Sequence, residues 1–324
     1  MNEFSLIKKY FAERSFVRKD VIVGIGDDAA ITQVPQSQSL ATTTDTLVNG
    51  VHFLPNTSAQ DIAHKAIAVN LSDLAAMGAE PSWLSLSLTL PDVDEAWLSA
   101  FSEKVAELTE YFSLQLIGGD TVKGPLSITI TAQGFVPQDS ILTRDGAKNG
   151  DWIFVTGTLG DAGAGLDILR NKLAIEDVSA RDYLVKRHRC PTPRVLAGTV
   201  LRRLASACID VSDGLLQDVM HIATASGTGV IIHLEKLPIS EALGSYVKDL
   251  HQALDYATSA GDDYELLFTV SEEQRNSVQT ALDSYSVQHT CIGQMTGATG
   301  KLDLKLNDEP FTLSLAKPLG YAHF

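Results

Sequence analysis

Aspartates recur at the ends of short apolar segments along this sequence of 324 residues. Five motifs share an acidic residue beside a strand-like run: GIGDDAA (24–30), TTTDT (42–46), IGGDT (117–121), DVSDG (210–214) and SAGDDYE (259–265). Loops at strand ends are where α/β proteins place ligands, and a neighbouring glycine lets a bulky ligand approach the backbone. Mg²⁺ prefers oxygen ligands, with one or two carboxylates and substrate phosphates around each ion. The motifs together predict a site for metal ions and phosphates.

A sixth acidic segment, NLSDLAAMGA (70–79), places Asn70 and Asp73 three residues apart and therefore on one face of a predicted helix. Each motif alone is a weak signal, because an aspartate beside a glycine is more often a turn or a helix cap than a metal ligand. Six such clusters, most of them at equivalent positions in the predicted topology, favour the metal–phosphate site.

Familiar phosphate-binding and hydrolase signatures do not occur in the sequence. There is no G-x-x-x-x-G-K-[ST], no kinase-like glycine loop followed by a lysine strand, no HEXXH and no GxSxG. The run GTLGDAGAG (157–165) could cradle phosphate at a helix N-terminus, but we favour a tight turn from strand to helix. Any phosphate site must therefore be built in another way.

Strand-like and helix-like segments alternate, which predicts a mixed α/β (α+β) architecture. Strands are predicted at 21–25, 40–44, 83–90, 114–117, 126–136, 152–157, 208–212, 230–235 and 264–270. Helices are predicted at 58–78, with Ser58 as N-cap, and at 93–112, 161–171, 179–188, 193–206, 214–226 and 272–284. The polar segment 143–152 separates two patterned regions, so we predict one domain over 1–142 and a second over 143–324.

Composition narrows the classes of protein to consider. Apolar residues make up 44% and charged residues 20% of the chain, as in globular proteins, and the net charge is −15. Such a charge argues against nucleic acid and anionic lipid as partners, and it implies that positive charge for phosphates comes from metal ions. No segment predicts a membrane span or a signal peptide, so we expect a cytoplasmic protein. The odd number of cysteines (Cys190, Cys208 and Cys291) indicates buried, reduced thiols.

The order of the motifs resembles one family closely, the thiamine-monophosphate kinases. The matching segments run over essentially the whole chain: GIGDDAA, TTDTLVNGVHF, KAIAVNLSDLAAMGA, LIGGDT, VTGTLG, DVSDGL, GDDYELLF and GYAHF. The resemblance implies the two-domain fold of aminoimidazole ribonucleotide synthetase, with a homodimer formed through the sheets of the N-terminal domains. It also implies transfer of the γ-phosphoryl group of ATP to thiamine monophosphate with several Mg²⁺ ions, which completes the synthesis of thiamine diphosphate.

Site residues carried over from the resemblance fall into three groups. The implied metal ligands are Asp28, Thr43, Thr44, Asp45, Asp73, Asp120, Asp210 and Asp213. Those implied to bind ATP are Gly119, Asp120, Arg144 and Ser212, and those near thiamine monophosphate are His52, Asp262 and Tyr321 in the C-terminal aromatic region. The chain departs from the family in having Asp262 where a glutamate is frequent, and in having Tyr321 as the nearest aromatic residue where a tryptophan is common.

The chemistry of this transfer needs charge neutralisation more than proton transfer. The acceptor is a phosphate oxygen that is largely ionised at neutral pH, so no general base is required. The obstacle is repulsion between two polyanions, which cations reduce. We therefore predict that Asp45, Asp73 and Asp120 hold the metal ions at the reacting phosphates. We also predict that the Arg144 guanidinium neutralises negative charge on the ATP phosphates.

Alternative interpretations stay open from the sequence alone. Arg144 could be a solvated loop residue, and His52 could be a polar residue at the end of a strand. Another synthetase of the same superfamily is one alternative function, although selenophosphate chemistry would call for a reactive cysteine near the N-terminus and the first cysteine is Cys190. A non-catalytic sensor of nucleotide or thiamine phosphate is the other.

Overall fold

The computed structural model describes residues 3–14, 16–312 and 320, and it divides the chain into two units. Unit 1 comprises Met1–Leu74 and Ala79–Asp139, and unit 2 comprises Ala75–Gly78 and Ser140–Phe324. The change of unit at 139/140 precedes the predicted domain boundary at 142/143 by three residues. The short segment 75–78, at the end of a long helix, belongs to unit 2 although the sequence around it belongs to unit 1.

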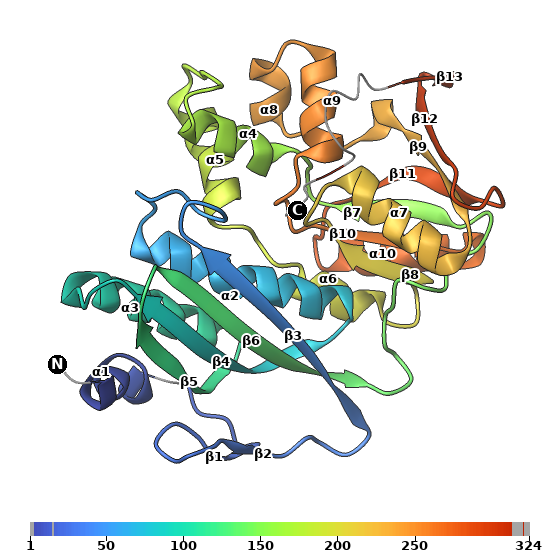
Figure 1. Cartoon of the computed structure of the whole chain (residues 1–324). Helices are drawn as coiled ribbons and strands as arrows, with labels where there is room; N and C mark the ends of the chain where they lie inside the picture. The colour runs from blue at the N-terminus through green and yellow to red at the C-terminus, as the bar shows by residue number, and fades with distance from the viewer. Residues whose placement is uncertain (1–2, 15, 313–319, 321–324) are drawn as a thin grey trace. The chain divides into compact units, whose positions relative to one another are not determined.

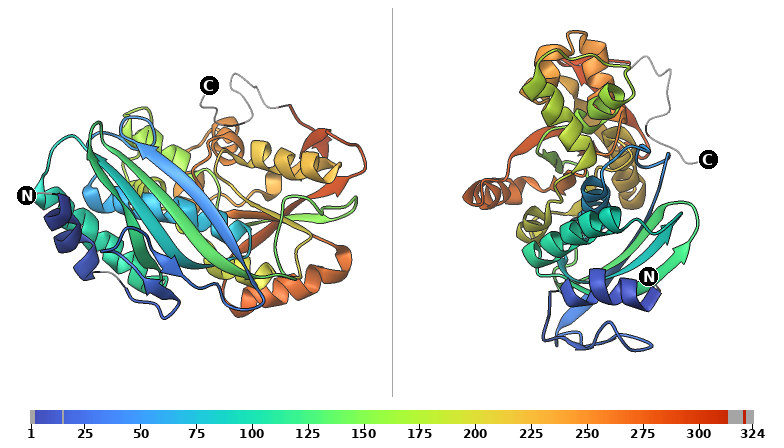
Figure 2. Two further views of the ribbon diagram at one scale, coloured as in Figure 1. Left: turned by 60° about the horizontal axis from the view of Figure 1, so that its bottom comes forward. Right: turned by 90° about the vertical axis from the view of Figure 1, so that its left-hand side faces the viewer.

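Unit 1 is built on a four-stranded sheet in the order β3-β6-β4-β5. Its helices and strands are α1 (Glu3–Tyr10), the 3-10 turn η1 (Ala12–Arg14), β1 (Val21–Val23), β2 (Ile31–Thr32), β3 (Gln38–Val48), α2 (Ala59–Ala76), β4 (Glu80–Leu90), α3 (Glu95–Tyr111), β5 (Gln115–Lys123) and β6 (Ser127–Pro137). β4 and β5 run parallel, whereas β6 is antiparallel to both β3 and β4. Helices α2 and α3 lie against one face of the sheet (Figures 1 and 2).

Alternation along the strands of unit 1 explains how that face is buried. Leu84, Leu86 and Leu88 of β4 are at most 5% exposed, and Ile128 and Ile130 of β6 are likewise buried. Since successive side chains of a strand point to opposite faces, these residues form the face that packs on the helices. α2 begins as predicted, because the Ser58 hydroxyl accepts a hydrogen bond from the backbone N–H of Asp61 over 3.1 Å.

Unit 2 contains a seven-stranded, mostly antiparallel sheet in the order β13-β12-β9-β11-β7-β10-β8. Its elements are β7 (Trp152–Thr156), α4 (Asp161–Leu169), α5 (Val178–Arg189), α6 (Val195–Leu201), β8 (Ala207–Asp210), α7 (Leu215–Ser226), β9 (Gly229–His233), η2 (Leu234–Lys236), α8 (Glu241–Tyr246), α9 (Leu250–Ser259), β10 (Leu266–Val270), η3 (Glu272–Gln274), α10 (Arg275–Ser284), β11 (His289–Thr296), β12 (Leu302–Leu306) and β13 (Glu309–Pro310).

Helices cover both faces of this sheet. On one face Ile153 and Val155 of β7 pack in a cluster with Leu215 and Val219 of α7. On the other face Phe154 belongs to a cluster that includes residues of α6 and α10, and its ring stacks on that of Phe268 with centroids 5.5 Å apart. A strand that is apolar on both faces reads as a continuous hydrophobic run, which is why WIFVT was recognisable as a strand.

The predicted mixture of helices and strands in two domains is confirmed, with differences in detail. The helix predicted at 193–206 ends at Leu201, because the chain turns there and Arg203 takes a left-handed conformation with φ +60°. All three cysteines are free thiols, as predicted, but only Cys208 is buried; Cys190 and Cys291 are half-buried. Within the described ranges, every helix is too short or too polar to cross a lipid bilayer.

Candidate active site

Unit 1 brings three of the predicted metal ligands together. The Thr43 hydroxyl of β3 donates a hydrogen bond of 2.5 Å to Asp73 Oδ2, which comes from α2. Asp45 lies two residues further along the same face of β3, and its carboxyl group interacts electrostatically with that of Asp73. Burial, and after it the charge of Asp73, raises the pKa of the Asp45 carboxyl to about 6. Two carboxylates are therefore held together where mutual repulsion disfavours ionisation of both.

The side chain of Thr44 lies on the other face of β3 from those of Thr43 and Asp45. Adjacent residues of a strand point to opposite faces, and the Thr44 hydroxyl lies 2.8 Å from the Thr131 hydroxyl on the exposed face of the sheet. Thr44 stays a predicted metal ligand, and its hydroxyl points away from Asp45.

Asp120 and Asp28 come from other segments of unit 1 than the Asp45–Asp73 pair. Asp120 is an exposed residue of β5, and its Oδ1 accepts a hydrogen bond from the backbone N–H of Thr121 over 2.9 Å. β3 and β5 are the two edge strands of the sheet, so their backbones are separated by three strand spacings, about 14 Å. Asp28 is exposed in the loop between β1 and β2. The backbones of Asp45 and Asp120 are therefore well separated across the sheet, whereas Asp73 comes from α2 and is not placed by this spacing.

The glycine before Asp120 is required by the close approach of two strands. A Cβ atom at Gly119 would lie 1.8 Å from the backbone oxygen of Leu86 in β4. No such overlap is tolerated, so any larger residue would force β5 away from β4. Gly119 is thus explained by packing, whatever else it contacts.

Replacing Gly119 with alanine should lower the free energy of unfolding by about 1–3 kcal/mol, the usual cost of forcing extra atoms into a packed region. Urea denaturation would measure the change. Gly118→Ala is the matched control, because a Cβ at Gly118 meets no atom within 4 Å. Equal stability of the two variants would contradict the strand contact.

His52 lies in the turn that follows β3. Its Nδ1 accepts a hydrogen bond of 3.0 Å from the backbone N–H of Val48, and its carbonyl oxygen accepts one from Lys65 Nζ over 3.3 Å. With Nδ1 as acceptor, a neutral imidazole carries its proton on Nε2. These contacts agree with the alternative interpretation that His52 is a polar residue at the end of a strand. They also fix the direction of its ring.

In unit 2 the acidic loop after β8 and the acidic loop before β10 lie side by side. β8 and β10 are paired neighbours, with Leu266 opposite Asp210. The backbone N–H of Asp262 donates to the carbonyl oxygen of Ser212 over 2.7 Å. Asp210 is buried, whereas Asp213 is half-buried and accepts a hydrogen bond from Gln217 Nε2 over 3.1 Å. The sheet thus gathers Asp210, Ser212, Asp213 and Asp262, all of which the sequence had singled out.

Asp218, which the sequence analysis missed, shapes the first of these loops. Its Oδ2 accepts the backbone N–H groups of Ser212, Asp213 and Gly214 at 3.1–3.2 Å. Burial, and after it the charge of Asp213, raises the pKa of Asp218 to about 7 although these hydrogen bonds oppose the shift. An acidic residue in the first turn of α7 was the available signal.

Arg144 is exposed in the loop that precedes β7. The Ser226 hydroxyl holds this loop: it donates to the carbonyl oxygen of Arg144 and accepts from the N–H groups of Gly146 and Ala147, each over 3.2 Å. The backbone is therefore fixed while the guanidinium extends from it. Tyr321, predicted near the substrate, lies outside the described residues.

The glycine-rich turn 157–165 is a strand-to-helix turn, as favoured from the sequence. α4 already begins at Asp161, and Gly157 and Gly160 take left-handed conformations before it. The Asp263 carboxylate accepts the N–H groups of Gly160 over 2.8 Å and of Ala162 over 3.4 Å. A carboxylate of the protein itself therefore occupies the N-terminus of α4, where a phosphate would have bound.

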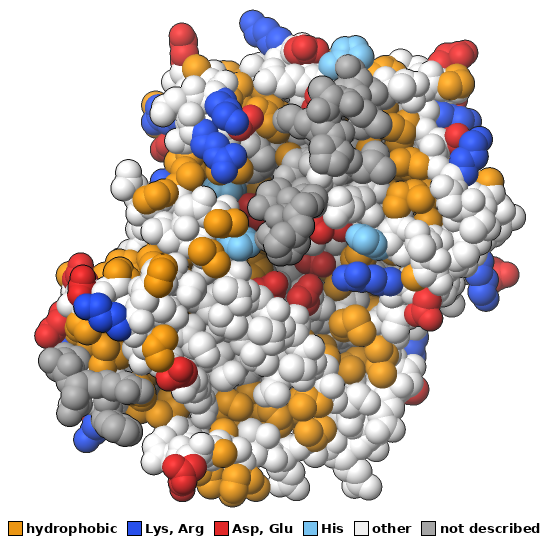
Figure 3. All heavy atoms as spheres, in the orientation of Figure 1, with side chains coloured by type: hydrophobic (Ala, Val, Ile, Leu, Met, Phe, Trp, Pro, Cys, Tyr) orange, Lys and Arg blue, Asp and Glu red, His pale blue; other side chains and the backbone are white. Residues whose placement is uncertain are grey.

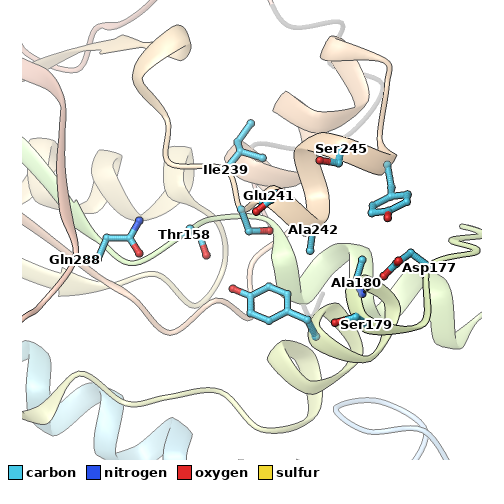
Figure 4. A pocket seen from close by; sticks show the side chains of 12 residues that line it. Thr158, Asp177, Ser179, Ala180, Ile239, Glu241, Ala242, Ser245 and Gln288 are labelled. Atoms are coloured by element: carbon cyan, nitrogen blue, oxygen red, sulfur yellow. Dashed lines mark hydrogen bonds between the residues drawn. The ribbon is translucent and has the colours of Figure 1, made fainter.

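A hollow of about 590 Å³ in unit 2 lies apart from the predicted chemistry. Among its lining residues are Asp177 and Ser179 near the start of α5, and Glu241 and Ser245 of α8 (Figure 4). None of the predicted site residues lines it. Its shape alone therefore does not indicate the reacting centre.

The donor atoms of the predicted site can be compared with those that a metal ion requires. Within the described residues, no group of three or more His, Cys, Asp or Glu side chains is placed to hold a metal ion. The pair Asp45–Asp73 with the Thr43 hydroxyl is nevertheless the kind of oxygen donor set that suits Mg²⁺, which commonly takes one or two carboxylates and completes its coordination with water and substrate phosphates. Burial and the charge of Asp73 raise the pKa of Asp45, so a cation bound by the two carboxylates would favour their ionised forms.

Family models identify the class of protein to which both halves of the chain belong. The family model described as AIR synthase related protein, N-terminal domain, matches residues 26–136, and the corresponding C-terminal domain model matches residues 148–305. Both halves of the chain are thus those of an AIR synthase related protein.

Similar individual proteins and solved structures identify a particular family within this class. Thiamine-monophosphate kinase of Escherichia coli (strain K12) is 54% identical over 322 residues, covering 99% of this chain and 98% of the relative. The crystal structure of thiamine-monophosphate kinase from Stenotrophomonas maltophilia K279a matches with a TM-score of 0.86 and 42% identity over 95% of this chain and 98% of that one. The structure of AaThiL complexed with AMPPCP and TMP matches with a TM-score of 0.77 and 33% identity over 99% and 96%. The chain belongs to the thiamine-monophosphate kinase family.

Proposed function

We propose that this protein transfers the γ-phosphoryl group of ATP to the phosphate of thiamine monophosphate, giving thiamine diphosphate and ADP. The observation that carries the proposal is the 54% identity to a thiamine-monophosphate kinase over nearly the full length of both chains. A structural neighbour that was solved with AMPPCP and TMP supports the same pair of ligands.

The residues of unit 1 would hold cations for the anionic substrates. Asp45 and Asp73, with the Thr43 hydroxyl beside them, are proposed as ligands of Mg²⁺, and Asp28 and Asp120 as further ligands once the phosphates are bound. A bound Mg²⁺ supplies the positive charge that reduces repulsion between the two phosphate groups. Asp210 and Asp213 of unit 2 are proposed as additional metal ligands.

The remaining predicted residues would bind and orient the substrates. Arg144 is proposed to pair with ATP phosphates through its planar guanidinium, and Ser212 and Gly119 to contact ATP. His52 would face the acceptor with Nε2, because Nδ1 is engaged by the backbone of Val48. Asp262 would face the cationic thiamine part. No side chain is needed as a general base, since the acceptor phosphate is largely ionised at neutral pH.

Direct detection of product tests this function. The protein would be incubated with ATP, Mg²⁺ and thiamine monophosphate, thiamine diphosphate would be measured as its fluorescent thiochrome, and ADP would be measured in parallel. Equal amounts of the two products are expected. Binding of both substrates without product would indicate instead the non-catalytic sensor.

We further propose that the protein is a cytoplasmic homodimer, because ATP is a cytoplasmic substrate and because unit 1 carries exposed apolar side chains. These side chains lie on and between β1, β2 and β3, and their exposed fractions are 65% for Ile22, 53% for Ile31, 39% for Val34 and 40% for Leu40. Figure 3 shows hydrophobic side chains gathered over the lower part of the view, where Figure 1 has these strands. Contiguous apolar surface of this kind is typical of an interface.

Ile31→Glu should therefore shift the protein from dimer to monomer, because a charge would be buried without a partner in the interface. Analytical ultracentrifugation at micromolar concentration would measure the mass. Val178→Glu, at an apolar residue of unit 2 that is 56% exposed, is the control and should leave the mass unchanged. A wild-type protein that sediments as a monomer would contradict the dimer and leave the phosphoryl transfer unaffected.

A further inference from the structure

The loop before β10 is held in an unusual backbone conformation. Gly261, Asp262 and Tyr264 all have positive φ angles, of 70°, 65° and 52°. For residues other than glycine this region of backbone conformation is strained. Such strain persists where the surrounding contacts fix it, and it is concentrated at functional sites.

Contacts with the neighbouring loop fix one side of the strained segment. The N–H of Asp262 donates to the Ser212 carbonyl over 2.7 Å, and the N–H of Tyr264 donates to the Val211 carbonyl over 2.8 Å. A Cβ atom at Gly261 would lie 2.5 Å from the Ser212 oxygen. The backbone therefore has little conformational freedom at Asp262. The direction of its side chain then depends on the groups that contact the carboxylate.

The last turn of α5 meets this segment with two consecutive side chains. Arg187 donates to Glu265 Oε1 over 2.8 Å and to the carbonyl oxygen of Asp263 over 3.4 Å. His188 follows it, and its Nδ1 lies 3.3 Å from Asp262 Oδ2. The His188 side chain is 6% exposed, whereas the Asp262 side chain is 29% exposed. One oxygen of the carboxylate thus faces a buried imidazole while part of the group remains accessible.

Helix α5 is itself held rigidly at this turn. A Cβ atom at Gly165 of α4 would lie 2.1 Å from the Leu184 carbonyl oxygen and 3.1 Å from His188 Cβ. The two helices therefore pack at backbone distance beside His188. The backbone that carries His188 therefore cannot move away from Asp262 without moving the whole helix.

We propose that His188 is a positioning residue that holds the Asp262 carboxylate in the orientation that binds the cationic thiamine part of the acceptor substrate. The proposal rests on the proposed function, and it assigns His188 to the acceptor and not to ATP. It also explains why an aspartate in a strained conformation has a buried histidine as its neighbour, since a single oriented carboxylate loses less rotational freedom on binding a cation.

Steady-state kinetics with two variants test this role. His188→Leu removes the ring nitrogen, and we expect KM for thiamine monophosphate to rise about tenfold, because the Asp262 carboxylate loses its close polar contact with the ring. KM for ATP and kcat should stay within about twofold, because no ATP contact is changed. His188→Asn places an amide nitrogen near the position of Nδ1 and should restore most of the affinity. If the leucine variant does not fold, His188→Gln, whose amide lies nearer the position of Nε2, takes its place.

A double-mutant cycle separates positioning from a general effect on the fold. In an Asp262→Asn background, His188→Leu should change KM for thiamine monophosphate no further, because His188 acts through the carboxylate. His289→Leu removes another histidine of unit 2 whose side chain is only 9% exposed, and it should leave the ratio of the two KM values unchanged.

Three results would overturn the proposal: an unchanged KM for thiamine monophosphate in the leucine variant, equal rises in both KM values, or additive effects in the double mutant. A wild-type protein that makes thiamine diphosphate while showing any of these would refute only the role of His188. A wild-type protein that makes none would refute the proposed function and this role with it.

Discussion

Asp45→Asn should reduce formation of thiamine diphosphate about 10³-fold at saturating substrates, the scale on which a missing group that stabilises transition-state charge lowers turnover. The carboxylate pair Asp45–Asp73 is the strongest concentration of negative charge that the structure documents in unit 1 among the predicted ligands. Without one carboxylate, the remaining donors should hold Mg²⁺ poorly. The thiochrome assay across a range of Mg²⁺ concentrations would measure the loss.

The same variant should be at least as stable as the wild type without metal. The folded-state pKa of Asp45 is raised from 3.8 to about 6, so ionised Asp45 is less favourable in the folded than in the unfolded chain. Its cost to folding is absent below about pH 4, grows between about pH 4 and 6, and is nearly constant above that, and asparagine removes this cost. Thermal unfolding in the presence of a chelator at pH 4, 6 and 7.5 would show the difference widening from the first pH to the second and changing little at the third.

The matched control for Asp45 is Asp92→Asn, which neutralises an exposed carboxylate of unit 1 in a pair with Lys123. It should leave turnover and stability unchanged, since exposed ion pairs contribute little. An Asp45→Asn variant with near-normal kcat at saturating Mg²⁺ would refute the assignment of Asp45 as a metal ligand.

Glu265→Gln should lower the free energy of unfolding by about 3–5 kcal/mol, the cost of leaving buried charges without their partner. Glu265 is fully buried and accepts hydrogen bonds from Arg187, from both Nε and Nη2 of Arg194, and from the Thr156 hydroxyl, at 2.5–2.8 Å. Glutamine keeps the shape but cannot neutralise two guanidinium groups. Urea denaturation followed by circular dichroism would measure the change.

Glu273→Gln is the control for this substitution, because Glu273 is exposed on η3 in the same unit. Its stability should lie within about 0.5 kcal/mol of the wild type. A loss below about 1 kcal/mol for Glu265→Gln would mean that the two arginines find other partners.

The regular elements were largely predictable because their residues alternate or repeat with clear periods. α2 and β4 were recognised within a few residues, and the Ser58 cap was predicted correctly. No element was assigned over 236–260 or 286–312, where α8, α9, β11, β12 and β13 lie. Several of these elements are short, and β12 and β13 stand in a polar context without strong alternation. Their formation depends on pairing with distant strands, as β11 does with β7 and β9.

The candidate site was predictable in its residue types more than in its contacts. The acidic motifs indicated Asp45, Asp73, Asp210 and Asp213, but they carried no information on which of these side chains contact one another. The sequence analysis missed the groups that hold the acidic loops in place. Arg187 and Glu265 are 78 positions apart, and Ser226 is 82 positions from Arg144. Such partners are set by the packing of whole elements, for which a single sequence carries no local signal.

Strand β3 has a consequence for how fragments of this protein would behave. Its eleven residues pair with β6, and the sheet order ends at β3 within the described ranges. A long outer strand of this kind is a template onto which another chain can add. A fragment that ends near residue 139 would carry this edge together with the exposed Ile22 and Ile31, and it should precipitate on expression unless a matching surface covers them.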